Sequence, residues 1–292
     1  VAGFLASTSY AVLAHQGARR TEFFNTGEER SCRREFYCLE AMKGQENAVS
    51  LLDYGTFDLI SSREGVPDQR RQLAYYIMPL FQGISLSEYP GRENAQWIRW
   101  KKSAEILEKV IDLVEDVHRR AVIHRDLHPG NFLYDEETRN LYLIDFGSSL
   151  ARTLDLEQDT EGENRGSRRF MSPEQFADPR SADARSDYFC IGGLLLYMLT
   201  FRSPFRRDRT RTTRPLSPEE CIEKPEELAE PVFREVLNFI NRLMRFERDA
   251  RYQTIEEIRK VWTALAEAIF LQDRDGDVSD RALETKTKEY FL

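Results

Sequence analysis

The stretch His124-Arg125-Asp126-Leu127-His128-Pro129-Gly130-Asn131, followed by Asp145-Phe146-Gly147, decides how the rest of the chain is interpreted. Two short apolar runs, at 131–134 and 141–144, lie between these motifs and are joined by the polar segment 135–140. This pattern predicts a β-hairpin. Because the two ends of a hairpin lie next to each other, the polar side chains of both motifs are expected to face a common cleft.

The segment before the first motif predicts a small sheet with one helix. Short apolar runs at 3–6, 10–14, 49–52 and 75–78 are bounded by turn residues, and the first two read as a hairpin. Apolar residues also recur at helical spacing within 36–42. Strands therefore dominate this part of the chain.

The segment after Gly83 predicts mainly helices. Apolar stripes at 106–117 and 255–269 have the period of amphipathic helices, and the run 191–199 is apolar nearly all round, as in a buried helix. Beyond 272 the apolar period is lost and charged residues dominate, which predicts a frayed tail.

Composition excludes several classes of protein. The formal charge of −8 over 292 residues argues against a broad nucleic-acid-binding surface. The longest apolar stretch, Ile191 to Phe201, is about half of the roughly 20 residues that cross a bilayer, so no membrane association is expected. Four scattered cysteines and four histidines form no metal-ligand pattern, and reduced thiols fit a cytoplasmic protein.

The two motifs together resemble those of the protein kinase family. Phosphoryl transfer depends mostly on metal ions and placement, which requires carboxylate and amide oxygens around the nucleotide phosphates. The resemblance implies an ATP- and Mg²⁺-dependent reaction in which Asp126 accepts or orients the substrate hydroxyl proton. Asn131 would hold one Mg²⁺, and Asp145 would hold metal that bridges the phosphates. A lone Asp-Phe-Gly is a weak signal, but both motifs with a strand pair between them are specific.

The resemblance extends from Gly3 to about Leu265. Met171-Ser172-Pro173-Glu174 matches the end of the family's activation segment, and Arg251 matches the arginine that pairs with its glutamate. Asp187 would accept hydrogen bonds from the catalytic-loop backbone. In this family the Arg125 position often receives an activating phosphate, for which Thr153, Thr160 and Ser167 are candidate sites.

The resemblance also implies a nucleotide slot between the sheet and the hairpin. Glu35 takes the position of the family's helix glutamate and Met78 that of its gatekeeper, while the hinge that lines adenine falls at Pro79-Leu80-Phe81. Apolar side chains would close the slot from both sides, namely Ala11, Leu133 and Ile144.

Two lysines of the family pattern are replaced. The strand lysine falls at Leu13, and the first lysine in the chain is Lys43, so Arg19 or Arg20 would have to substitute. The catalytic-loop lysine is replaced by His128, as in small-molecule kinases related to aminoglycoside phosphotransferases. A histidine there could still stabilise charge when it is protonated.

We therefore expect an α+β, two-lobed, protein-kinase-like fold. Residues 1–82 would form a small β-rich N-lobe, 83–271 a large, mainly helical C-lobe, and 272–292 a charged tail. Too little chain precedes the first apolar run for the family's first strand and Gly-rich loop, so either these pieces have been removed or the N-lobe is abbreviated.

The expected function is phosphorylation of Ser or Thr on a protein substrate. The residues leave three alternatives open: a pseudokinase that acts as a binding or allosteric partner, a small-molecule kinase, or transfer of another group by the same fold. The altered Leu13 and His128 positions favour the first alternative, and the His128-Pro129-Gly130 run favours the second. The segment 171–174 and Arg251 favour a protein substrate.

Overall fold

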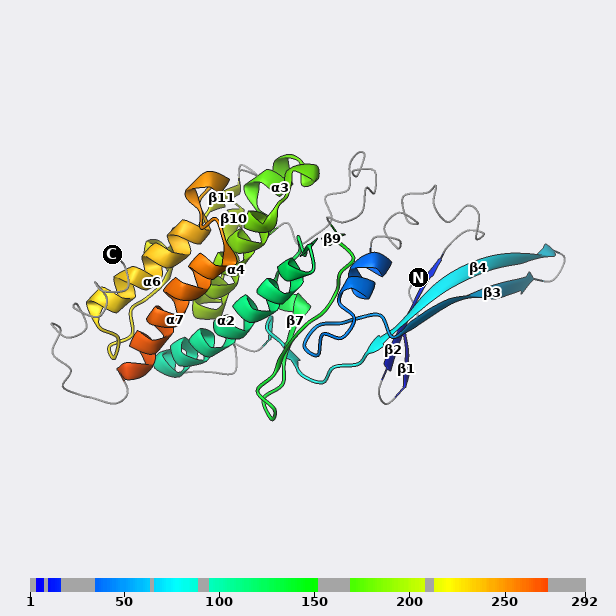
Figure 1. Cartoon of the computed structure of the whole chain (residues 1–292), viewed down its shortest axis with the longest axis horizontal. Coiled ribbons are helices and arrows are strands. Elements are labelled where there is room, and N and C mark those ends of the chain that lie inside the picture. Colours follow the sequence, from blue (N-terminus) through cyan, green and yellow to red (C-terminus); the bar gives the residue numbers. More distant parts are fainter. Residues whose placement is uncertain are drawn as a thin grey trace.

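A sheet at one end of the molecule and a mainly helical body at the other are joined by short strands and loops (Figure 1). The computed structural model describes residues 4–7, 10–16, 35–63, 66–88, 95–151, 169–207 and 213–272. The combination of a sheet with a mainly helical body is the expected α+β fold. The lobe boundaries at 82 and 271 remain predictions, and the tail from 273 lies outside the described residues.

The sheet contains four antiparallel strands in the order β1-β2-β4-β3. They are β1 (Phe4–Ser7), β2 (Tyr10–Gln16), β3 (Asp53–Arg63) and β4 (Val66–Pro79). The hairpin predicted from the first two apolar runs is confirmed as the β1–β2 pair. Because β2 pairs with β4 only between Leu73 and Pro79, β3 and β4 continue past it as a long two-stranded ribbon (Figure 1).

The prediction of a strand at 49–52 is wrong. These residues lie between a helical segment at 35–41 and the start of β3, and they form no strand. Their backbone instead bonds the neighbouring elements, since Val49 donates to the Leu143 carbonyl and Leu51 to the Leu39 carbonyl. The apolar character of the run reflects burial against the core, with Val49 and Leu51 only 6% and 7% exposed.

Within the residues that the structure describes, four long helices form the helical body. They are α2 (Gln96–Arg119), α4 (Ala184–Thr200), α6 (Glu230–Leu243) and α7 (Ile255–Leu271). The predicted stripe of α2 is buried, at Ile106, Val110, Leu113 and Val117. In α4 nearly every side chain is buried, which confirms the helix predicted from its apolar run. Within the described residues, no helix has the length and apolar character needed to cross a membrane.

The centre of the body depends on close contact between α4 and α6. A Cβ placed on Gly192 would lie only 2.8 Å from the Leu243 Cβ and 2.9 Å from Met244 Cγ. Any larger residue at 192 would therefore push the two helices apart. A capping box at Asp183 and Ser186 defines the start of α4, whose first turn carries Asp187.

Shorter elements connect the sheet to the helical body. Those that precede α4 in the chain are β5 (Ile84–Ser85), β6 (Val122–Ile123), the 3₁₀ turn η2 (Pro129–Asn131), β7 (Phe132–Tyr134), β8 (Leu141–Leu143), β9 (Leu150–Ala151), α3 (Pro173–Ala177) and η3 (Pro179–Ser181). Those beyond α4 are β10 (Phe205–Arg207), β11 (Thr213–Pro215), α5 (Pro218–Cys221) and η4 (Arg248–Ala250). Strands β5, β7 and β8 form one small sheet, and β6 pairs with β9.

Candidate active site

The hairpin of β7 and β8 joins the two sequence motifs, as predicted. Phe132 pairs with Leu143, so the residues that flank this pair lie next to each other. The Ile144 N–H donates to the Asn131 carbonyl at 2.9 Å, immediately before Asp145. The catalytic-loop end and the Asp-Phe-Gly motif therefore share one edge of the hairpin.

Asn131 and Asp126 are linked across the catalytic loop. The Asn131 Nδ2 donates to the Asp126 backbone oxygen at 2.9 Å, and the Asn131 side chain is almost completely buried. This bond fixes the rotamer of the amide, so that its oxygen points away from the Asp126 carbonyl. Asp126 itself is half-buried, with its side chain 15% exposed.

Asp145 is exposed and adopts a left-handed backbone conformation with φ of 67°. Its Oδ1 accepts from the Gly147 N–H at 2.9 Å. Within the described residues, no donor contacts its Oδ2. Asp is one of the few residues that adopt this conformation at low cost, and the turn directs its carboxylate outward while the next residue, Phe146, is fully buried.

The Asn131 and Asp145 side chains fit a magnesium ion that is shared with a nucleotide. Mg²⁺ usually binds one or two protein oxygen ligands and completes its octahedron with phosphates and water. An amide oxygen and an exposed carboxylate supply such a pair. Across the described ranges, no group of three or more His, Cys, Asp or Glu side chains is arranged to hold a metal alone.

Glu35 lies beside the Asp-Phe-Gly turn. A Cβ placed on Gly147 would be 3.1 Å from the Asp145 Oδ1 and 3.9 Å from the Glu35 Oε2, so both carboxylates approach the same point. Glu35 is only 7% exposed. The helix at 35–41 thus presents its glutamate to the motif, where the sequence resemblance predicted it.

The Asp187 carboxylate binds the backbone of the catalytic loop. It accepts from the backbone N–H groups of His124 at 2.9 Å and Arg125 at 2.8 Å, as predicted. It also contacts the His118 Nε2 at 2.8 Å. Burial alone would raise the pKa of Asp187, but the hydrogen bond and charge of His118 hold it below the ordinary value. The loop is therefore anchored by an ionised, fully buried carboxylate.

Arg125 connects the catalytic loop to the activation segment. Its backbone is left-handed with φ of 64°, and its side chain is buried. The Nε donates to the Ser148 carbonyl at 2.7 Å and the guanidinium Nη1 to the Pro179 carbonyl at 3.3 Å. The proposed acceptor sites for an activating phosphate, Thr153, Thr160 and Ser167, lie outside the described residues.

Gln175 is a positioning residue that the sequence analysis missed. It is 2% exposed, and its Nε2 donates to the Arg125 carbonyl at 2.8 Å. Its Oε1 accepts from the Ser172 hydroxyl at 2.9 Å. The Ser-x-x-Gln spacing at the start of α3 is a capping-box signal that could have identified it. No sequence pattern indicates the hydrogen bond from Gln175 to the Arg125 carbonyl of the catalytic loop.

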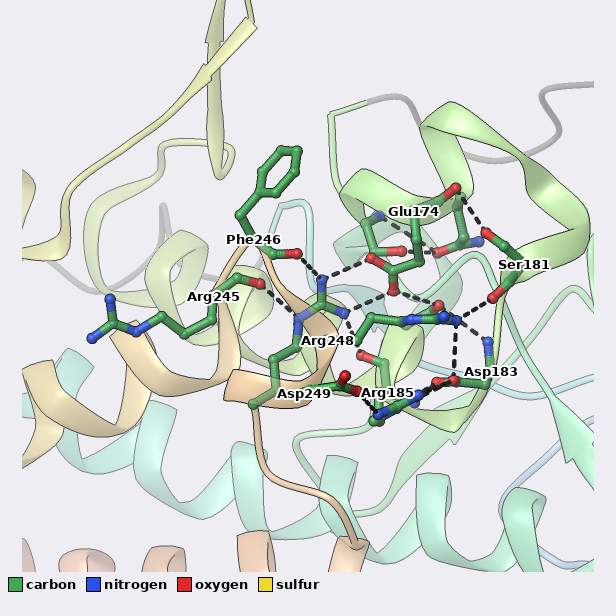
Figure 2. Close-up of polar contacts among 12 residues, drawn as sticks. Glu174, Ser181, Asp183, Arg185, Arg245, Phe246, Arg248 and Asp249 are labelled. Atoms are coloured by element: carbon green, nitrogen blue, oxygen red, sulfur yellow. Dashed lines mark hydrogen bonds and ion pairs between the residues drawn. The ribbon is translucent and has the colours of Figure 1, made fainter.

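The end of the activation segment is clamped by Glu174 and Arg251. The guanidinium donates to both carboxylate oxygens at 2.8 and 2.7 Å, and the Ser186 hydroxyl adds a third bond at 2.7 Å. Burial would raise the pKa of Glu174, but the Arg251 and Ser186 hydrogen bonds hold it below its usual range. Figure 2 shows Glu174 within a wider polar network that includes Arg185 and Arg248. The predicted pair is confirmed.

The candidate nucleotide-slot residues come from both sides of the cleft. In the sheet, Ala11 of β2 pairs with Met78 of β4, which is half-buried. Leu133 is half-buried on β7, opposite Tyr142 of β8. The ring of Phe81 stacks on Tyr142 with centroids 4.2 Å apart and planes 9° apart. The hinge is thereby tied to the hairpin.

Leu80 and Leu13 differ from this group. Leu80 is 36% exposed, so any role at the hinge would fall to its backbone. Leu13 pairs with Tyr76 of β4, two positions along β2 from Ala11 and therefore on the same face of the strand. The possible substitutes Arg19 and Arg20 lie outside the described residues.

His128 lies beside the proposed base. Its Nε2 is 3.7 Å from the Asp126 Oδ1, and its Nδ1 accepts from the Gly130 N–H at 3.1 Å. The sequence predicted a site role at this position but not the contact with the Gly130 backbone. The imidazole thus faces the Asp126 carboxylate on one edge and the loop backbone on the other.

Comparison with known proteins agrees with this geometry. A family model described as the protein kinase domain matches residues 15–263. The chain is 31% identical over 179 residues to the probable serine/threonine-protein kinase PknB of Bifidobacterium longum, covering 60% of this chain and 24% of that protein. It is 29% identical over 159 residues to the serine/threonine-protein kinase PrkC of Bacillus subtilis, covering 54% and 22%.

A solved structure supports the fold. The Cydia pomonella granulovirus kinase PK-1 superposes with a TM-score of 0.57 at 17% identity, covering 87% of this chain and 85% of that chain. The chain spans about a quarter of the length of the curated relatives it matches, 24% and 22% for the two named above. Because the family model covers most of the sequence, the chain belongs to the protein kinase domain family.

Proposed function

We propose that this domain transfers the γ-phosphoryl group of ATP, with Mg²⁺, to Ser or Thr hydroxyls of a protein substrate. The observation that carries the proposal is the arrangement of Asp126, Asn131 and Asp145 around one end of the β7–β8 hairpin. A domain that only binds partners has no chemical need for this set of oxygen ligands. The serine/threonine-kinase names of its relatives support the same reaction.

Each proposed role follows from where the side chain lies. Asp126 receives the proton of the substrate hydroxyl as the oxygen attacks the γ-phosphorus and the bond to the leaving ADP oxygen breaks. Asn131 and Asp145 would hold Mg²⁺, which when bound would neutralise charge on the phosphates. The fixed amide of Asn131 and the outward carboxylate of Asp145 need little rearrangement to do so.

The nucleotide base would lie between the sheet and the hairpin. We assign Ala11 and Met78 to the sheet side of the slot, Leu133 to the hairpin side and Leu80 and Phe81 to the hinge. Glu35 would orient the phosphate end from its position beside the Asp-Phe-Gly turn.

A protein substrate is supported by the clamped activation segment. The Glu174–Arg251 pair and the Gln175 bond to the loop hold 171–175 against the catalytic loop, beside Asp126. A small-molecule kinase has no evident use for a fixed segment here. We also propose a cytoplasmic site of action, since the buried side chains of Cys38 and Cys190 are reduced thiols.

The pseudokinase alternative depends on Leu13. Without the family's lysine on β2, the phosphates lose one cation, which lowers the rate without removing the base or the metal ligands. The alternative would gain weight only if nucleotide binds but no phosphate is transferred.

The test is a phosphate-transfer assay with labelled ATP, Mg²⁺ and generic protein substrates. Asp126→Asn and Asp145→Asn should each lower the rate at least about 100-fold, because each removes a group that acts in the transition state. Glu137→Gln, on the exposed turn of the same hairpin, is the matched carboxylate control and should keep the rate. An inactive, folded wild type, or transfer that survives in both variants, would reject the proposal.

A further inference from the structure

The His128 ring is held in one tautomer by the loop backbone. Its Nδ1 lies 3.1 Å from the Gly130 nitrogen, and a backbone N–H can only donate. Nδ1 must therefore be the acceptor, and a neutral ring then carries its proton on Nε2. A lysine at this position could not make the same bond, because an ammonium group has no acceptor.

Gly130 is required for this arrangement. A Cβ on residue 130 would lie 2.8 Å from the His128 Cε1 and 3.1 Å from its Nδ1. The ring therefore packs directly on the glycine backbone. The turn that carries both residues is itself held in place, since the Ser85 hydroxyl donates to the Pro129 carbonyl at 3.2 Å.

The opposite edge of the ring faces the proposed base. The Nε2 is 3.7 Å from the Asp126 Oδ1, and the two side chains are 23% and 15% exposed. Phe170, at the end of the activation segment, lies on another side with ring centroids 6.3 Å apart. The 3.7 Å between the His128 Nε2 and the Asp126 Oδ1 is longer than a hydrogen bond. Catalytic hydrogen bonds are often long before substrate binds and shorten in the complex with substrate.

We propose that His128 is a positioning residue that donates from Nε2 to the Asp126 carboxylate and orients it for the substrate hydroxyl, with Gly130 selecting the tautomer. The inference rests on the proposed function. In this role His128 acts as a neutral hydrogen-bond donor, whereas a lysine at the same position would supply a positive charge. Affinity for ATP should then depend little on this residue, and the rate of the transfer step should depend on it strongly.

Two amide variants test the roles of the two ring nitrogens of His128 separately. In His128→Gln the side-chain nitrogen can occupy the place of Nε2 and keep the donor to Asp126. In His128→Asn the oxygen can occupy the place of Nδ1 and keep the acceptor for Gly130, while the donor is lost. We expect His128→Asn to lower kcat about tenfold and His128→Gln to stay within about threefold of wild type, with KM for ATP unchanged in both.

A second measurement does not need activity. Long-range ¹H–¹⁵N correlation spectra of the imidazoles at about pH 8, where a histidine is ordinarily neutral, identify the tautomer of each ring. The His128 signals are assigned by their loss in His128→Gln. We expect the Nε2–H form in the wild type, and its loss of dominance in Gly130→Ala, where a Cβ displaces the ring.

The outcomes distinguish the inference from the proposed function. An inactive wild type rejects the kinase proposal, while the spectra still decide the tautomer. An Nδ1–H ring, equal rates for the Gln and Asn variants, or a raised KM for ATP with kcat intact would overturn the role of His128. His128→Lys adds a check, because a rate above that of wild type would favour a charge contact with phosphate instead.

Discussion

The hairpin side of the cleft and the sheet side follow the family pattern to different degrees. On the hairpin side, Asp187 and Gln175 each hold a backbone group of the catalytic loop, and Asn131 bonds across it. On the sheet side, β2 carries Leu13 where the pattern has a lysine. Glu35, which the pattern pairs with that lysine, still lies beside Gly147.

The two sides would carry different tasks in the proposed function. The hairpin side would supply the catalytic base, the metal ligands and the segment that meets the substrate, all of which act on the reacting atoms. The sheet side would line the adenine slot and contact the phosphates. A change on the sheet side should therefore alter nucleotide affinity and rate by modest factors, whereas a change on the hairpin side should affect the fold or the chemistry itself.

The largest effect is expected from breaking the clamp with Arg251→Ala. The Arg251 side chain is fully buried, and it also donates to the carbonyls of Arg245 at 2.7 Å and Phe246 at 3.0 Å. Its removal leaves the Glu174 carboxylate buried without its counterion. We expect a loss of about 3 to 5 kcal/mol in the free energy of unfolding, measured by denaturant titration.

Arg180→Ala is the matched control for this prediction. Arg180 pairs with Asp178 on the same segment, but the two side chains are 49% and 45% exposed. Water screens such a pair, so its loss should lower the free energy of unfolding far less than the loss of Arg251 does. Equal destabilisation by the two arginine variants would contradict the assignment of the clamp to buried electrostatics.

The Leu13→Lys variant restores the family's lysine and tests the sheet side of the comparison. Residue 13 takes the position of the family's strand lysine in the sequence resemblance, and it shares a face of β2 with Ala11. We expect kcat/KM for ATP to rise about tenfold, equivalent to about 1.4 kcal/mol of added transition-state stabilisation. Steady-state kinetics with varied ATP measure this change.

Two further variants show whether charge is responsible. Leu13→Met keeps an apolar side chain and should leave the kinetics near those of wild type. Glu35→Gln combined with Leu13→Lys should lose most of the gain if the new ammonium is oriented by that carboxylate. A gain that is the same with and without the Glu35 change would show that the lysine acts on phosphate alone.

The sequence predicted those site residues whose type and spacing match a single role in the family motifs. The motifs fix the register of Asp126, Asp145 and Arg251, and the Asp187 and Arg251 contacts follow from that register. The fold was predictable for the same reason. Repeats of period 3.6 on α2 and α7 left little doubt about the helices.

The rest depends on contacts that no local pattern encodes. Val49 and Leu51 are apolar because they are buried, and sequence alone could not distinguish that burial from a strand. Phe81 and Tyr142 are far apart in sequence, so their stacking could not be read from either position. Likewise, the acceptor role of His128 depends on the turn geometry at Gly130.

The smallest effect we predict is a pH dependence of stability that originates on the hairpin side, at His124. The ring is completely buried, and its edge packs on Phe146 with centroids 4.9 Å apart. Burial lowers the pKa of His124, and the nearby carboxylates of Asp187, Asp126 and Asp145 offset this only in part, while His128 adds to it. The folded protein therefore keeps His124 neutral at a pH where the unfolded chain protonates it.

This difference in proton binding sets the sign of the effect. Above about pH 6.5 neither state is protonated at His124 and stability is unaffected. As the pH falls below that value, the unfolded state binds more protons, so stability should fall by up to about 1.4 kcal/mol per pH unit until the folded-state pKa is reached. Denaturant unfolding between about pH 8 and pH 5 keeps Asp187 ionised, since the pKa of this carboxyl is also lowered. His124→Phe should flatten the curve below pH 6.5, and parallel curves for the two proteins would assign the pH dependence to other groups.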